Sequence, residues 1–233
     1  MNNHFRLNKS ILLKTNHPIA YESLDHINPF GTIQDNTRNY RFFHKCQKLY
    51  GADLSLLDLE CSGGGLVFEF ALNGYKAIGL EGSDASQKIG RANWRTIPEN
   101  LFTCDITKDF SLEDTSSNKQ QTFKVISCWE VLEHIHADDI APLLANVKKH
   151  LYEDGIFVGS ISKDPDDSLH VTIQENPWWI EVFKDNGFDM IVGYSDVLEF
   201  EEFCRGVAGG RFDSHNYMRD PHKGLHFIAR KKK

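Results

Sequence analysis

A glycine-rich turn follows directly on a short apolar run near residue 60. The run Leu54–Leu59 is apolar enough for a buried strand, and residues 60–65 then read Glu-Cys-Ser-Gly-Gly-Gly. Glycines let a backbone pass close to a ligand, and a helix that starts at Leu66 presents free N–H groups. Tight packing between a strand and a helix also uses glycines. The turn alone therefore leaves ligand binding and packing as alternatives.

Acidic residues end the next two apolar runs. Glu81 follows the run Lys76–Leu80, and Asp105 follows the run Asn100–Cys104. A carboxylate at the end of the second strand can accept hydrogen bonds from both hydroxyls of a ribose, and an acid followed by Ile106 suits the rim of an adenine pocket. The alternatives are an exposed carboxylate for Glu81 and a turn cap for Asp105.

Groups that can move a proton follow the apolar runs at 124–128 and 156–161. These groups are Glu130, Glu133, His134, His136 and His170. A histidine near its ordinary pKa suits a general base, because it binds and releases a proton around neutral pH. For each histidine the alternative is a surface or capping role.

Metal ligands are not expected. Asp164, Asp166 and Asp167 form an acidic cluster, but the proline and the lysine among them favour a solvated loop. The five cysteines are widely spaced, and no Cys-x-x-Cys pair occurs. We therefore expect no structural zinc and no disulfide framework, which is typical of a reduced, cytoplasmic protein.

The elements that position these residues alternate along the chain. Strands are expected over residues 54–59, 76–80, 100–104, 124–128, 156–161, 190–194 and 225–229. Helices are expected over residues 66–72, 138–151 and 178–186, and an earlier amphipathic helix ends at Gly51. This order predicts an α/β fold with a doubly wound, mostly parallel seven-stranded sheet and helices on both faces.

We expect one domain with two parts. Residues 1–50 form an N-terminal extension and a cap helix, and residues 51–233 form the main domain, with an insertion near residues 198–218 that shapes the substrate site. The cap helix covers one face of the core; a further alternative is that the loop before it covers a ligand. The role of the first thirty residues stays open.

Composition excludes several classes of protein. The 233 residues carry a net charge of −7 and are 40% hydrophobic, which excludes a largely disordered chain and argues against a nucleic-acid footprint. The sequence contains no run of eighteen apolar residues, and its start does not look like a signal peptide. We expect no membrane and no nucleic-acid partner, and the oligomeric state stays open.

Two common nucleotide motifs do not fit. Counted from Gly63, the third glycine of G-x-G-x-x-G is replaced by Phe68, and no Gly-Lys-Ser/Thr P-loop occurs. The chain instead resembles the class I S-adenosylmethionine-dependent methyltransferase family from about Leu54 to Phe188. The resemblance lies in the ordered segments LLDLECSGGGLV, AIGLEGSD, NLFTCDIT, FKVISCWEVLEHI and LLANVKKHLYEDGIFVGSIS. It implies the Rossmann-like methyltransferase fold and S-adenosylmethionine as the cofactor.

The resemblance also assigns site residues. Along the turn and the methionine end of the cofactor it places Asp58, Glu60, Cys61, Gly63 and Gly64. At the ribose, the adenine and the sulfonium side it places Glu81, Gly82, Ser83, Asp105, Ile106, Cys128 and Trp129. The segment WEVLEHI is similar to one that lines the family's active site. His134 is therefore the preferred catalytic residue, with Glu130 and His170 as further candidates.

One position departs from the family pattern. The family turn is acid-x-Gly-x-Gly-x-Gly, whereas this chain has Glu60 and Ser62 at the first two glycine positions. The Glu60 carboxylate either pairs with the ammonium or sulfonium of the cofactor or crowds the site.

The leading hypothesis is methyl transfer from S-adenosylmethionine to an oxygen or nitrogen of a small polar molecule, such as a sugar or metabolite. One alternative is a non-catalytic scaffold that binds an adenosine ligand, and a second is a methyltransferase that acts on a protein. A nicotinamide-dependent oxidoreductase is disfavoured by Phe68.

Overall fold

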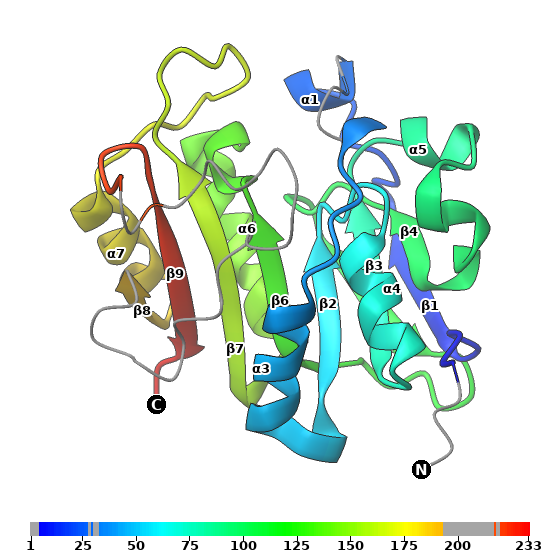
Figure 1. Cartoon of the computed structure of the whole chain (residues 1–233). Helices are drawn as coiled ribbons and strands as arrows, with labels where there is room; N and C mark the ends of the chain where they lie inside the picture. Colours follow the sequence, from blue (N-terminus) through cyan, green and yellow to red (C-terminus); the bar gives the residue numbers. More distant parts are fainter. Residues whose placement is uncertain (1–4, 28, 30–32, 193–216, 218–219) are drawn as a thin grey trace.

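Seven strands form the central sheet of the computed structural model (Figure 1), which describes residues 5–27, 29, 33–192, 217 and 220–233. The strands are β2 (Ser55–Leu59), β3 (Lys76–Glu81), β4 (Leu101–Thr103), β6 (Phe123–Trp129), β7 (Leu151–Ser162), β8 (Phe188–Val192) and β9 (Gly224–Lys231). Their order is β4-β3-β2-β6-β7-β9-β8, and β9 runs opposite to the other six strands. The predicted α/β fold with a mostly parallel seven-stranded sheet is confirmed.

Helices pack on both faces of this sheet, as expected. The longer helices are α3 (Tyr40–Tyr50), α4 (Gly65–Leu72), α6 (Ala137–His150) and α7 (Asn176–Asp185). On one face α3 and α4 share a core cluster with Leu56 and Val125, and on the other α6 and α7 pack on Leu57 and Ile126. Because neighbouring residues of a strand point to opposite faces, Leu56 and Leu57 belong to different clusters.

Shorter elements link the sheet and its helices. They are the helices α1 (Leu24–Ile27) and α5 (Ala85–Lys88) and the 3-10 helices η1 (Gly51–Asp53), η2 (Ala92–Arg95), η3 (Pro98–Asn100) and η4 (Leu132–His134). Within the described part of the chain, no helix has both the length and the apolar composition that crossing a bilayer requires.

A second, two-stranded sheet was not predicted. β1 (Ile11–Thr15) pairs antiparallel with β5 (Phe110–Asp114), and Ile11, Phe110 and Leu112 bury their side chains in the main core. The alternation of apolar and polar residues in each strand is short, and the two strands lie far apart in the sequence. Neither strand carries a strong local signal for this reason.

The N-terminal part of the chain packs on the rest. In α3, Phe42, Phe43 and Cys46 are buried, and Asn39 caps the helix by accepting a hydrogen bond from the Phe42 N–H at 3.0 Å. The expected division at residue 50 remains a prediction. The insertion expected near 198–218 lies outside the described residues, except for Tyr217.

Candidate active site

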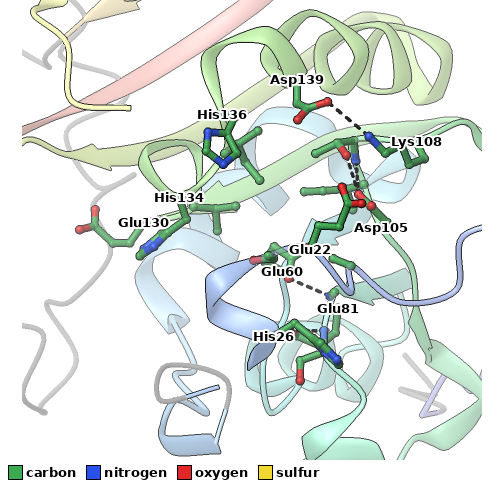
Figure 2. A pocket seen from close by; sticks show the side chains of 18 residues that line it. Glu22, His26, Glu60, Glu81, Asp105, Lys108, Glu130, His134, His136 and Asp139 are labelled. Carbon is green, nitrogen blue, oxygen red and sulfur yellow. Dashed lines mark hydrogen bonds and ion pairs between the residues drawn. The ribbon is translucent and has the colours of Figure 1, made fainter. Parts of the chain in front are cut away.

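A cavity opens at the carboxyl ends of β3, β4 and β6 (Figure 2), beside the point where the strand order reverses at β2. Ligands of such sheets bind at this edge. Eight residues predicted to bind the cofactor or to act in catalysis line the cavity: Glu60, Glu81, Gly82, Ser83, Asp105, Ile106, Glu130 and His134.

The N-terminal segment forms one wall of this cavity. The wall residues from this segment are Ala20, Glu22, Ser23 and His26. The Ala20 N–H donates to the Gly82 carbonyl oxygen at 2.9 Å, and the Asp105 N–H donates to the His17 carbonyl oxygen at 2.9 Å. These two bonds fix the segment across the ends of β3 and β4, so part of the first thirty residues covers the site.

The carboxylate of Glu81 is held by backbone N–H groups. Glu81 is only 2% exposed; its Oε2 accepts from the Ser62 N–H at 2.7 Å and its Oε1 accepts from the Ser83 N–H at 3.1 Å. Glu81 therefore ties the turn after β2 to the end of β3 while it lines the cavity. The predicted contact of Glu81 with a ribose stays a prediction. The structure adds a second role, in which Glu81 holds the turn after β2 against the end of β3.

Asp105 both lines the cavity and caps a turn. Its Oδ1 accepts from the Thr107 N–H at 2.9 Å and from the Thr107 hydroxyl at 2.6 Å. The sequence left a turn cap as the alternative to an adenine contact. The geometry makes the two roles compatible, because Asp105 and Ile106 both face the cavity.

The turn after β2 keeps the backbone shape of a glycine turn. Glu60, Ser62 and Gly64 all have a left-handed backbone, with φ of 58°, 50° and 76°. A side chain at such a position costs about 1–3 kcal/mol and persists only where the surrounding structure holds it there. Glu60 and Ser62 stand where the family pattern has glycine, so the chain places side chains here at an energetic cost.

Gly63 is required by the chain's own packing. An added Cβ would lie 2.6 Å from Oδ1 of Asn36 and 2.8 Å from the carbonyl oxygen of Asp35. The same carbonyl oxygen accepts from the Ser62 hydroxyl at 2.9 Å and from the Gly63 N–H at 3.2 Å. The loop before α3 thus lies on the glycine turn.

Glu60 also lines a second, smaller cavity. The other residues of this cavity are Asp35, Thr37, Asn39, Asp58, Cys61, Leu66 and Trp129. Asp58 is 5% exposed, and its Oδ1 accepts from the Ser127 hydroxyl at 2.6 Å. Three of the residues predicted at the cofactor line this smaller cavity, namely Asp58, Cys61 and Trp129. Gly63, Gly64 and Cys128 were also predicted at the cofactor, but they line neither cavity.

The thiols near the site are buried and protonated. Burial, and after it the negative charge of Glu60, raises the pKa of Cys104 to about 12. The same two causes, in the same order, raise the pKa of Cys128. These cysteines are therefore unsuited to act as nucleophiles.

His134 has a defined orientation at the cavity wall. Its Nδ1 lies 3.2 Å from the Leu169 carbonyl oxygen. Because a carbonyl oxygen only accepts, Nδ1 carries the proton and Nε2 of the neutral ring keeps its lone pair. His170 does not line the cavity, but its ring meets that of His134 edge to face, with centroids 4.8 Å apart.

The third catalytic candidate, Glu130, is engaged elsewhere. It lines the cavity, but its Oε2 accepts a hydrogen bond from the Tyr217 hydroxyl at 2.6 Å. Figure 2 shows its carboxylate turned away from the carboxylates of Glu60 and Asp105. Burial, and then the charge of Glu130, raises the pKa of Tyr217, so this pair is a protonated phenol on a carboxylate.

Three groups could hold a metal ion. Glu133, His134 and His170 each offer one ligand atom, and these atoms lie within 4.8 Å of one another. Two imidazoles and a carboxylate suit zinc or ferrous iron. However, Oε1 of Glu133 accepts from the Ser162 N–H at 2.9 Å inside the core. The expectation of no metal remains a prediction.

Several residues of the cavity were not predicted. Glu22, His26, Lys108 and Asp139 complete its polar lining, and Lys108 forms an ion pair with Asp139 at 3.4 Å. His26 and Glu22 precede the strand–helix alternation and had no local signal. Asp139 lies on the first turn of α6, whose start at the edge of the sheet could have indicated it.

Comparison with known proteins identifies the class. Residues 32–194 match the family described as "Methyltransferase domain". This match covers more than half of the chain, so the chain belongs to this family of methyltransferases. The resemblance seen in the sequence is confirmed, and so is S-adenosylmethionine as the cofactor of the family.

One similar curated protein is the ubiquinone biosynthesis O-methyltransferase of Neisseria meningitidis, 30% identical over 121 residues. The match takes 51% of this chain and 48% of the relative, so the chain spans about half the length of the curated relative that it matches.

Solved structures share the fold. A TehB-like methyltransferase from Corynebacterium glutamicum has a TM-score of 0.56 at 16% identity, covering 88% of this chain and 94% of the other. The 1,6-didemethyltoxoflavin-N1-methyltransferase of Burkholderia thailandensis has a TM-score of 0.57 at 14% identity, covering 90% and 84%.

The described residues fit the cofactor by their chemistry. S-adenosylmethionine carries a sulfonium and an ammonium group, and the two cavities present carboxylates at Asp58, Glu60 and Glu81. The larger cavity would hold the nucleoside against Glu81 and Ile106, and the smaller one would hold the amino acid.

Proposed function

We propose that this methyltransferase moves the methyl group of S-adenosylmethionine to an oxygen or a nitrogen of a small polar molecule, such as a sugar or metabolite. The observation that carries the proposal is the walled cavity. It joins the predicted cofactor residues to His134, and the segment from Ala20 to His26 closes one side. A walled cavity admits a small molecule more readily than a folded macromolecule.

The lining favours a polar acceptor. Glu22, His26, Lys108, His136 and Asp139 add charged or hydrogen-bonding groups beyond the cofactor residues. These groups would orient hydroxyl or amino groups. The similar proteins include an O-methyltransferase and an N1-methyltransferase, so both acceptor atoms belong in the proposal.

The residues of the chain have separate roles in the proposed reaction. When bound, the cofactor supplies a methyl group that its sulfonium already activates, so the protein chiefly has to align the acceptor. Glu81, Asp105 and Ile106 hold the nucleoside. His134 takes the proton of the acceptor at Nε2, because the Leu169 carbonyl oxygen fixes the proton on Nδ1.

A non-catalytic scaffold of the same fold is the second candidate. It is favoured by one observation: the Glu60 side chain borders both cavities where the family pattern has glycine. In that case the Glu60→Gly variant would bind S-adenosylmethionine more tightly than the wild type. A methyltransferase that acts on a protein is the third candidate.

The cellular setting remains part of the proposal. Cys46, Cys61, Cys104 and Cys128 are free and buried, which is consistent with a reducing compartment. We propose a cytoplasmic protein that does not bind nucleic acid.

The test is a product assay. The purified protein is mixed with S-adenosylmethionine and sets of small hydroxyl or amino compounds, and S-adenosylhomocysteine is quantified. The proposal is supported if small molecules of one chemical class are methylated by the wild type and the His134→Asn variant loses this turnover. Turnover only with added proteins would replace it with the protein-directed alternative, and no turnover despite cofactor binding would favour the scaffold.

A further inference from the structure

Glu60 occupies the only position among the described residues that borders both cavities of the site. The larger cavity contains Glu81 and Asp105, and the smaller one contains Asp58 and Trp129. A ligand that fills both must pass the side chain of Glu60. The group that joins the two halves of such a ligand therefore lies next to this carboxylate.

The carboxylate of Glu60 is held in place. Its Oε2 accepts a hydrogen bond from the Gly82 N–H at 2.8 Å. A Cβ added at Gly82 would lie 3.2 Å from both carboxylate oxygens, so the whole group faces the end of β3. Its backbone keeps a φ of 58°, a strained value that glycine would adopt freely. An unfavourable backbone that carries a fixed side chain indicates a use for that side chain.

Two further acidic side chains lie beside this part of the site. Glu81 lines the same cavity and Asp58 lines the other, and both are buried. Burial, and after it the carboxylate of Glu60, raises the pKa of the Cys104 and Cys128 thiols. A carboxylate in partly buried surroundings acts strongly on a nearby charge, because water screens it less.

The chemistry of the cofactor shows which of its charged groups would lie next to Glu60. In S-adenosylmethionine the ribose and the amino acid are joined at a sulfonium, which carries a fixed positive charge. After methyl transfer the same sulfur is a neutral thioether. We infer that Glu60 makes the site prefer the cationic methyl donor over the neutral product, S-adenosylhomocysteine, and so promotes product release. This inference rests on the proposed function.

The test compares dissociation constants by calorimetric titration, and needs no turnover. The probes are S-adenosylmethionine, S-adenosylhomocysteine and sinefungin, which carries an amine in place of the sulfonium. The variants are Glu60→Gln, which keeps the size, and Glu60→Gly, which removes the side chain and the strain. Glu99→Gln is the matched control, because it removes an exposed carboxylate that lines neither cavity.

In Glu60→Gln and Glu60→Gly we expect the preference for S-adenosylmethionine over S-adenosylhomocysteine to fall by on the order of tenfold. Sinefungin should follow S-adenosylmethionine, and Glu99→Gln should keep the wild-type ratio. An unchanged ratio in both Glu60 variants, with unfolding midpoints like that of the wild type, would overturn the inference. Equal tightening of all three ligands in Glu60→Gly would show that Glu60 crowds the site instead. If the wild type binds none of them, the proposed function itself fails.

Discussion

Replacement of Glu81 by glutamine tests the link between the glycine turn and the cofactor site. Glu81 accepts hydrogen bonds from the N–H groups of Ser62 and Ser83 at 2.7 and 3.1 Å. Glutamine keeps one acceptor oxygen but turns an amide donor toward the second N–H. Alanine would leave both N–H groups without this acceptor, so its effect on binding would be mixed with a disturbed turn.

The magnitude follows from these contacts. A hydrogen bond to a charged group contributes about 1.5–3 kcal/mol, and Glu81→Gln loses one of two. We therefore expect the free energy of unfolding to fall by about 1.5–3 kcal/mol. The affinity for S-adenosylmethionine should fall at least about tenfold, because a ribose loses one of its two acceptors as well.

The assay pairs chemical denaturation with calorimetric titration of the cofactor. Glu99→Gln is the matched control, because Glu99 is an exposed carboxylate on η3. If Glu81→Gln lowers the free energy of unfolding but keeps the wild-type affinity, the ribose assignment is wrong. If neither quantity changes, the two hydrogen bonds to Glu81 do not stabilise the fold as expected.

Four further predictions follow from the described contacts. His134→Asn should lower kcat by about a hundredfold and leave the Kd for S-adenosylmethionine within twofold; equal turnover would return His134 to a structural role. Burial lowers the pKa of His150 from 6.5 to about 4. Between these two pH values the imidazole is therefore protonated in the unfolded chain and neutral in the folded chain. The free energy of unfolding should then fall by up to about 3 kcal/mol as the pH drops from 6.5 to 4, and denaturation of His150→Gln should show a flatter dependence. Gly159→Ala should reduce the free energy of unfolding by at least about 1–3 kcal/mol, because its Cβ would overlap the Cys128 carbonyl oxygen; an unchanged thermal midpoint would refute this. Treatment with EDTA should leave turnover unchanged, and a loss that zinc restores would instead assign the ligand set around His134 to a metal.

Much of the sheet was predictable because its strands are continuous apolar runs between turn signals. The run Leu54–Leu59 became β2 (Ser55–Leu59), and the helix expected over 138–151 became α6 (Ala137–His150). The start of β7 was predicted too late, at Ile156. The helix α6 runs directly into this strand at Leu151, which pairs with Phe123 before a register shift.

The sequence predicted the acids of the site better than its walls. Glu81 and Asp105 could be placed at the cavity because each follows an apolar run at the carboxyl end of a strand, while their contacts with a ligand stay predictions. The segment around Ala20 has no such signal, since its place depends on hydrogen bonds to residues more than sixty positions away. The direction of the Glu60 side chain was also hidden, because it depends on a left-handed backbone that sequence patterns ascribe to glycine.

The most direct test of the account is calorimetric titration of the purified protein with S-adenosylmethionine, S-adenosylhomocysteine and NAD in separate experiments. Saturable binding of the two adenosyl ligands and no binding of NAD is the predicted result. Binding of NAD, or no binding of either adenosyl ligand to protein shown to be folded, would contradict the assignment of this cavity to the methyl donor.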